Sequence, residues 1–106
     1  MNIQKMMKQA QKMQRQMAET QEALAAQTVE ASAGGGKVTV IANGAGDITS
    51  IKIDPAIVDP EDVEFLEDVI LSGIKQASDK AKALAADEMG KVTGGLGGGM
   101  GIPGLG

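Results

Sequence analysis

The chain has 106 residues and a formal net charge of −4, from 14 acidic and 10 basic side chains. It contains 15 Gly and 7 Met but no Cys, His, Trp or Tyr, and Phe65 is its single aromatic residue. The length suits one domain, and the missing residue types exclude disulfide scaffolds, thiol catalysis, Ser–His triads and nearly every structural zinc site. No apolar run is long enough to span a membrane, and the N-terminus lacks the apolar region of a secretory signal. We therefore expect a cytoplasmic protein.

One long helix is predicted over residues 3–26, because no Gly or Pro interrupts residues 1–33 and apolar side chains recur at alternating steps of three and four. These positions repeat as the a and d positions of a coiled coil. We call this set the apolar stripe. Its members are Ile3, Met6, Ala10, Met13, Met17 and Leu24, with Thr20 at the one polar position of the repeat. The flanking positions are mainly neutral, so interhelical ion pairs do not select the partner. We expect the stripe to be a packing or dimer seam.

Three strands are predicted next, over residues 28–33, 37–44 and 48–54, joined by glycine-rich turns into an antiparallel meander. In the second of these, Val38 and Val40 point to one face and Ile41 to the other. A strand with apolar side chains on both faces needs cover on both, by helices or by a partner. Because the whole chain also has few large apolar residues for a core, we expect self-association.

A second helix is predicted to begin with Asp59 as N-cap and Pro60 in the first turn, and to continue to about residue 89. Gly73 lies within it, and Gly90 is a plausible stop. We expect a single domain over residues 1–93 and a disordered Gly-rich tail over 94–106, which has too few large side chains to offset its chain entropy. The fold class is therefore α+β, in the order helix, three-stranded meander, helix.

The charges are unevenly distributed along the chain. Residues 1–18 contain four cations and no acid, whereas residues 54–68, the acidic segment, contain only acids among their charged side chains. The four cations, which we call the basic row, are Lys5, Lys8, Lys12 and Arg15. Their spacing of three, four and three places them on one side of the predicted helix, away from the apolar stripe, over roughly 15 Å of its axis.

The basic row, interleaved with Gln side chains, suits contact with phosphates through charge and hydrogen bonds. The lack of aromatic side chains argues against a platform for stacked single-stranded bases, so duplex backbone binding with weak sequence preference is the natural chemistry. Two alternatives stay open: the row is simply a solvated helix face, or the Met-rich stripe grips a protein partner. No acid–base pair, metal cluster or phosphate loop is recognisable, so we expect no enzyme activity, metal or cofactor.

The chain resembles a known family in an ordered set of segments. These are MMKQAQKMQRQM at 6–17, VEASAGGGKVTVIANGAGDITSIKIDP at 29–55, FLEDVILSGIKQASDKA at 65–81 and EMGKVTGGLGGGMGIPG at 88–104. In these segments, which cover nearly its whole length, the chain resembles the YbaB/EbfC family of bacterial nucleoid-associated proteins.

The resemblance implies an α-β-β-β-α homodimer in which the long helices project like the arms of a tweezer. It also implies binding to double-stranded DNA, association with the nucleoid and a role in chromosome organisation or gene expression, without a small-molecule substrate. By position, the segment KQAQKMQR falls on the projecting helix where DNA contact is expected. The matching cations are those of the basic row, Lys5, Lys8, Lys12 and Arg15.

Overall fold

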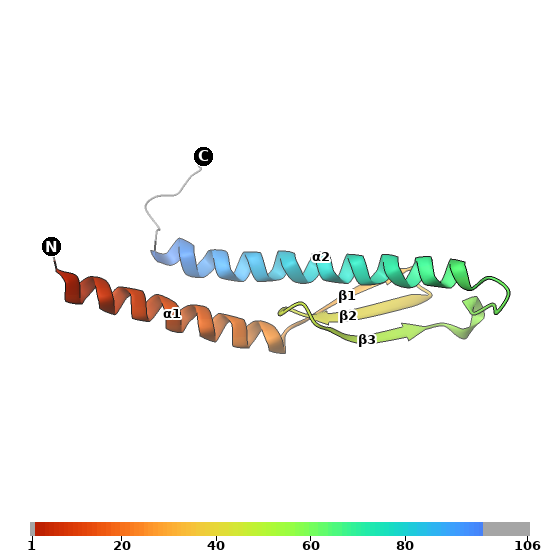
Figure 1. Cartoon of the computed structure of the whole chain (residues 1–106), viewed down its shortest axis with the longest axis horizontal. Coiled ribbons are helices and arrows are strands. Elements are labelled where there is room, and N and C mark those ends of the chain that lie inside the picture. The colour runs from red at the N-terminus through yellow and green to blue at the C-terminus, as the bar shows by residue number, and fades with distance from the viewer. Residues whose placement is uncertain (1, 97–106) are drawn as a thin grey trace, which may run out of the picture.

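A computed structural model of the chain describes residues 2–96 as two long helices and one antiparallel sheet (Figure 1). In chain order the elements are α1 (Ile3–Ala26), β1 (Thr28–Ala33), β2 (Val38–Asn43), β3 (Ile48–Ile53), the short 3-10 helix η1 (Pro55–Ile57) and α2 (Val63–Leu96). This order confirms the predicted α-β-β-β-α fold. The three strands match their predicted ranges to within one residue at each end.

The core lies between α2 and one face of the sheet. The strands follow the order β1-β2-β3, and in their register Ala31 and Ile51 flank Val40 on its two sides. Val38 and Val40 on β2 are fully buried, as is Ala77 on α2. Small side chains dominate this contact, so the helix can lie close to the strands.

Gly73 allows α2 to lie close to β2. A Cβ atom built at this position would lie 2.9 Å from Cγ2 of Val40, well inside ordinary van der Waals contact. Glycine therefore weakens the helix locally but lets α2 settle on β2. The close packing of α2 against the sheet therefore explains why a glycine occurs inside this helix.

The turn between β2 and β3 ties α1 to the sheet. The Gly44 backbone N–H donates to the carbonyl oxygens of Leu24 and Gln27, at 2.9 and 3.0 Å. Leu24 is buried beside this turn, and a Cβ atom at position 44 would lie 2.7 Å from the Leu24 carbonyl oxygen. These contacts satisfy carbonyls at the C-terminal end of α1 and fix the direction in which the helix leaves the sheet.

The predicted start of the second helix at Asp59 is wrong. The Asp59 carboxylate accepts a hydrogen bond from the Glu61 N–H at 2.9 Å, which forms a turn instead of a helix cap. Asp62 accepts from the Phe65 N–H at 3.3 Å, and α2 begins at Val63. Asp is a favoured N-cap residue, and here the aspartate three residues after the predicted one binds a backbone N–H of the first helical turn.

The predicted stop at Gly90 is also wrong, because α2 continues to Leu96. A Cβ atom at Gly90 would meet nothing within 4 Å, so the residue lies on an open helix surface. Helical glycine there costs about 1 kcal/mol relative to alanine, which does not end a long helix. Residues 94–96 of the predicted tail are thus helical, and residues 97–106 lie outside the described part of the chain.

The described chain covers only one face of its sheet. α2 lies over β1 and β2, while the face that carries Thr39 and Ile41 has no helix across it within residues 2–96. α1 instead extends away from the sheet beside the later part of α2, so the molecule measures 70 × 29 × 16 Å (Figure 1). The helix ends near Asn2 and Leu96 form one end of this elongated shape, and the start of α2 forms the other.

Candidate nucleic-acid interface

All four side chains of the basic row are exposed on α1. The helix starts immediately before them, where Asn2 caps it by accepting a hydrogen bond from the Lys5 N–H at 3.1 Å. Within residues 2–96 the ion pairs involve only Lys37 and Lys91 among the cations. The row therefore presents four uncompensated positive charges along the part of α1 that leaves the sheet.

The apolar stripe meets α2 only in part. Leu24 is buried, and Met13 and Thr20 are half-buried on the side of α1 that faces α2. Met6, Ala10 and Met17 are exposed, and Ile3 at the free end of the helix is 67% exposed. The stripe is thus partly buried between Met13 and Leu24, where Met17 is still 36% exposed, and it is exposed from Ile3 to Ala10.

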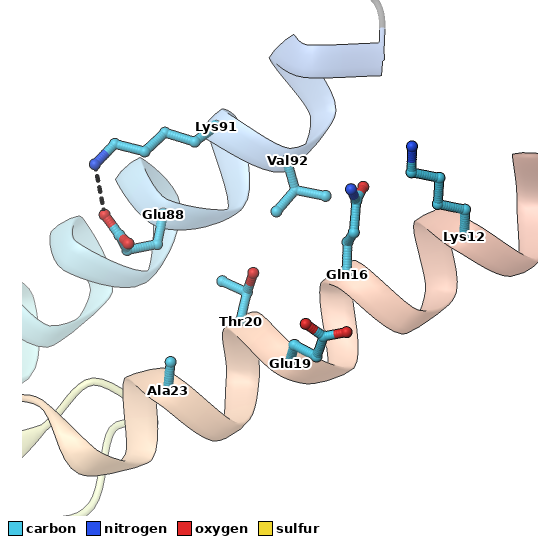
Figure 2. A pocket seen from close by; sticks show the side chains of 8 residues that line it. All are labelled: Lys12, Gln16, Glu19, Thr20, Ala23, Glu88, Lys91 and Val92. Atoms are coloured by element: carbon cyan, nitrogen blue, oxygen red, sulfur yellow. Dashed lines mark hydrogen bonds and ion pairs between the residues drawn. The ribbon is translucent and has the colours of Figure 1, made fainter.

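A groove of about 600 Å³ separates α1 from α2 beside the basic row. Its α1 wall carries Lys12, Gln16 and Glu19, and Lys91 and Glu88 stand on the α2 wall (Figure 2). Lys12 is the only member of the basic row among the described residues that line this groove. The groove therefore carries charges of both signs.

Lys91 is held by carboxylates of its own helix. The Lys91 Nζ atom lies 2.8 Å from the Glu88 carboxylate and 3.8 Å from that of Asp87. The hydrogen bond to Glu88 is the main reason that the pKa of Lys91 is raised above its usual value. Lys91 therefore remains a cation, paired at the edge of the groove. The sequence shows this i, i+3 spacing, but not that both residues line the same groove as Lys12.

The acidic segment lies at the opposite end of the molecule from the basic row (Figure 1). It includes η1 and the first turns of α2. Because exposed charges are screened over about 8–10 Å at physiological salt, acids at the far end of a molecule 70 Å long hardly weaken the field of the row. The negative net charge is therefore a poor guide to the surface of α1.

The described residues offer neither a metal site nor a membrane span. Within residues 2–96, no cluster of three or more acidic, His or Cys side chains could hold a metal ion. In the same range, neither helix is apolar enough over a sufficient length to cross a bilayer.

Comparison with known proteins identifies the family. The sequence model of the YbaB/EbfC DNA-binding family matches residues 1–96, which include both helices and the sheet. The chain belongs to this family. The resemblance seen in the sequence is thereby confirmed.

Curated relatives of this YbaB/EbfC chain are similar over almost their whole length. A protein of Acetivibrio thermocellus is 56% identical over 98% of this chain and 89% of its own, and one of Pelotomaculum thermopropionicum is 52% identical over 98% and 95%. Both carry the name nucleoid-associated protein. An uncharacterized protein of Helicobacter pylori has a crystal structure that matches with a TM-score of 0.60 at 22% identity, over 70% of this chain and 86% of its own. That structure supports the fold alone.

Proposed function

We propose that this YbaB/EbfC chain binds double-stranded DNA through the basic row on α1, with little sequence specificity. The observation that carries the proposal is the row itself: four exposed cations on one helix side, without ion pairs in the described part of the chain. Lysine and arginine side chains of this kind neutralise phosphates and release counterions. The family's DNA-binding description and the relatives' name support the same partner.

The proposed contacts are to the sugar–phosphate backbone and not to base edges. The side chains between the cations are mainly Gln, which hydrogen-bond to phosphates, and the single aromatic of the described chain, Phe65, belongs to the first turn of α2 and not to α1. Stacking of unpaired bases therefore has no support on α1. Binding of this type would suit a role in chromosome organisation or in the regulation of gene expression, in the nucleoid.

We further propose that the protein acts as a homodimer. On β3, Ile48 and Ile51 are 37% and 41% exposed, although Ile51 is paired in register with buried Val40 and points to the same face. Ile74 is half-buried against the core at the neighbouring flank of α2. We call Ile48, Ile51 and Ile74, with the half-buried Ile53, the β3–α2 patch. An apolar surface of this kind next to a small core supports pairing with a second copy.

The position of Ile74 on the flank of α2 that faces β3 follows from helix geometry. Ala77 is fully buried against the sheet, and Ile74 and Lys80 lie three residues before and after it, hence on opposite flanks. The Lys80 Nζ atom donates to the Glu30 carbonyl oxygen on β1 at 2.8 Å. Ile74 therefore lies on the other flank, toward β3, where the exposed isoleucines are.

The experiment that tests DNA binding replaces the whole basic row by glutamine. The variant Lys5→Gln, Lys8→Gln, Lys12→Gln, Arg15→Gln keeps the helix propensity of α1 and removes four positive charges. We expect its affinity for a duplex of mixed sequence to fall at least about 100-fold at low salt, because its phosphate contacts are lost. Fluorescence anisotropy with labelled duplex measures this directly.

A control variant removes the same charge elsewhere. It carries glutamine at four cations outside α1, namely Lys37, Lys52, Lys75 and Lys82. We expect this control to bind nearly as the unmodified protein does. Equal losses in the two variants would show that net charge, and not the basic row, governs binding, and full binding by the row variant would refute the site.

A further inference from the structure

The groove between α1 and α2 has a cation on each wall, and the two cations differ in their surroundings. Lys12 on α1 belongs to the basic row and has no ion pair within residues 2–96. Lys91 on α2 is paired with Glu88 at 2.8 Å and with Asp87 at 3.8 Å. Figure 2 shows the Lys91 side chain extended along α2 to Glu88, away from Lys12. Lys91 is thus beside the proposed DNA site but directed to its own helix.

We propose that Lys91, on the α2 wall of the groove, is a further DNA contact. Glu88 restrains it, because the Glu88 carboxylate competes with phosphate for the Lys91 ammonium group. The inference rests on the proposed function and extends the binding surface from α1 to α2. While Lys91 is paired with Glu88, the α2 wall contributes no net attraction for DNA phosphates. In the released form Lys91 and Lys12 would hold a phosphate backbone from both sides of the groove.

The exposure of the pair favours such an exchange. The Lys91 side chain is 68% exposed, whereas that of Glu88 is 27% exposed. A lysine has a flexible four-carbon stem and three rotatable donors, so its ammonium group can turn to a new acceptor without moving the backbone. Ion pairs this exposed are weak, so a phosphate can compete with the Glu88 carboxylate, the nearer of the two partners of Lys91. Glu88 therefore reduces binding by Lys91 without abolishing it.

The test is Glu88→Gln, which keeps the size of the side chain and removes its charge. We expect the variant to bind duplex DNA about two- to fivefold more tightly per chain, as the release of an exposed ion pair allows. The dependence of log K on log salt should also become steeper by about 0.9 per chain, since each chain gains one phosphate contact. Anisotropy titrations at several salt concentrations give both numbers.

Glu19→Gln is the matched control. Glu19 lines the opposite wall of the same groove and forms no ion pair within the described residues, so its removal changes the charge equally but releases no cation. We expect a small gain in affinity and an unchanged salt slope. The double variant Glu88→Gln, Lys91→Gln should lose the steeper slope, because the released cation is absent.

The inference is overturned if Glu88→Gln and Glu19→Gln have the same salt slope, or if the steeper slope persists without Lys91. Its failure is distinguishable from failure of the proposed function. If the unmodified protein binds DNA through the basic row but does not respond to Glu88→Gln, only the role of Lys91 is refuted. If the unmodified protein does not bind duplex DNA at low salt, both proposals fail.

Discussion

At the scale of single residues, polar contacts fix the turns that join the elements. Asp54 shows this at the end of β3: its carboxylate accepts a hydrogen bond from the Ala56 N–H at 2.9 Å and one from the Lys37 Nζ atom at 3.4 Å. The backbone bond from Ala56, followed by the bond from Lys37, lowers the pKa of Asp54 below its usual 3.8. The charged carboxylate is therefore the form that the folded chain prefers.

This preference predicts a pH dependence of stability. Because the folded pKa is depressed, Asp54 stabilises the fold above its unfolded pKa, and this contribution is lost as the pH falls through the folded value. We expect Asp54→Asn to lower the urea midpoint at neutral pH and to lose less stability than the unmodified chain on acidification to about pH 3. Asp79→Asn, an exposed carboxylate on α2, is the control and should leave the acid sensitivity unchanged. Equal acid sensitivity of Asp54→Asn and the unmodified chain would contradict this role.

Residue types predict that such a local hydrogen bond forms, but not which of several nearby residues forms it. The glycine-rich turn predicted before β3 is present, and in it the Asn43 side chain accepts from the N–H groups of Ala45 and Asp47, both at 3.0 Å. The prediction placed the N-cap of the second helix at Asp59, whereas Asp62 accepts from the Phe65 N–H and α2 begins at Val63. The sequence could not decide because both side chains find a backbone N–H to bind.

At the scale of elements, periodicity predicted which segments are helices and strands but not what each face contacts. The basic row is found on one side of α1 as its spacing required. Of the apolar stripe, predicted to be a packing or dimer seam, Leu24 is buried and Met13 half-buried within the chain, whereas Met17 between them and the members nearer the N-terminus are exposed. A heptad pattern describes the side chains of one helix, and the length over which a neighbour follows it depends on the whole fold.

Replacing the two glycines Gly73 and Gly90 of α2 by alanine should change the stability of the protein in opposite directions. Gly73→Ala should destabilise the protein by about 1–3 kcal/mol, because its Cβ would lie 2.9 Å from Val40 Cγ2, in a fully buried β-branched side chain that has no room to move. Gly90→Ala should be neutral or stabilising by up to about 1 kcal/mol, since its Cβ would meet open space and alanine favours the helix. Urea unfolding followed by circular dichroism measures both. Similar effects of the two substitutions would contradict the packing of α2 on β2.

At the scale of the whole molecule, the β3–α2 patch is the basis for the proposed homodimer. Ile51→Glu places a charge in the patch, and we expect it to convert a dimer into monomers because the buried carboxylate would lack a partner. Ser32→Glu adds the same charge on the opposite, exposed face of β1 and should remain dimeric. Light scattering coupled to size-exclusion chromatography reports the mass. A dimer that persists in Ile51→Glu would place the interface elsewhere, with the exposed members of the apolar stripe as the next surface to test.

The elongated shape also explains why the net charge is misleading. The sequence already shows that cations gather in residues 1–18 and acids in residues 54–68. It does not show that the connecting sheet and the antiparallel helices place these segments at opposite ends of a molecule 70 Å long. This separation depends on the Gly44 contact with α1 and on the packing of α2 over β2. Both are long-range contacts that local patterns do not encode.

The salt dependence of duplex binding tests the central claim most directly. If a dimer contacts phosphates with all four cations of the basic row in each chain, it makes about eight contacts, and log K should fall against log salt with a slope of about −7. Replacement of the row by glutamine should bring this slope close to zero. A slope that is the same before and after the replacement would contradict DNA binding by α1.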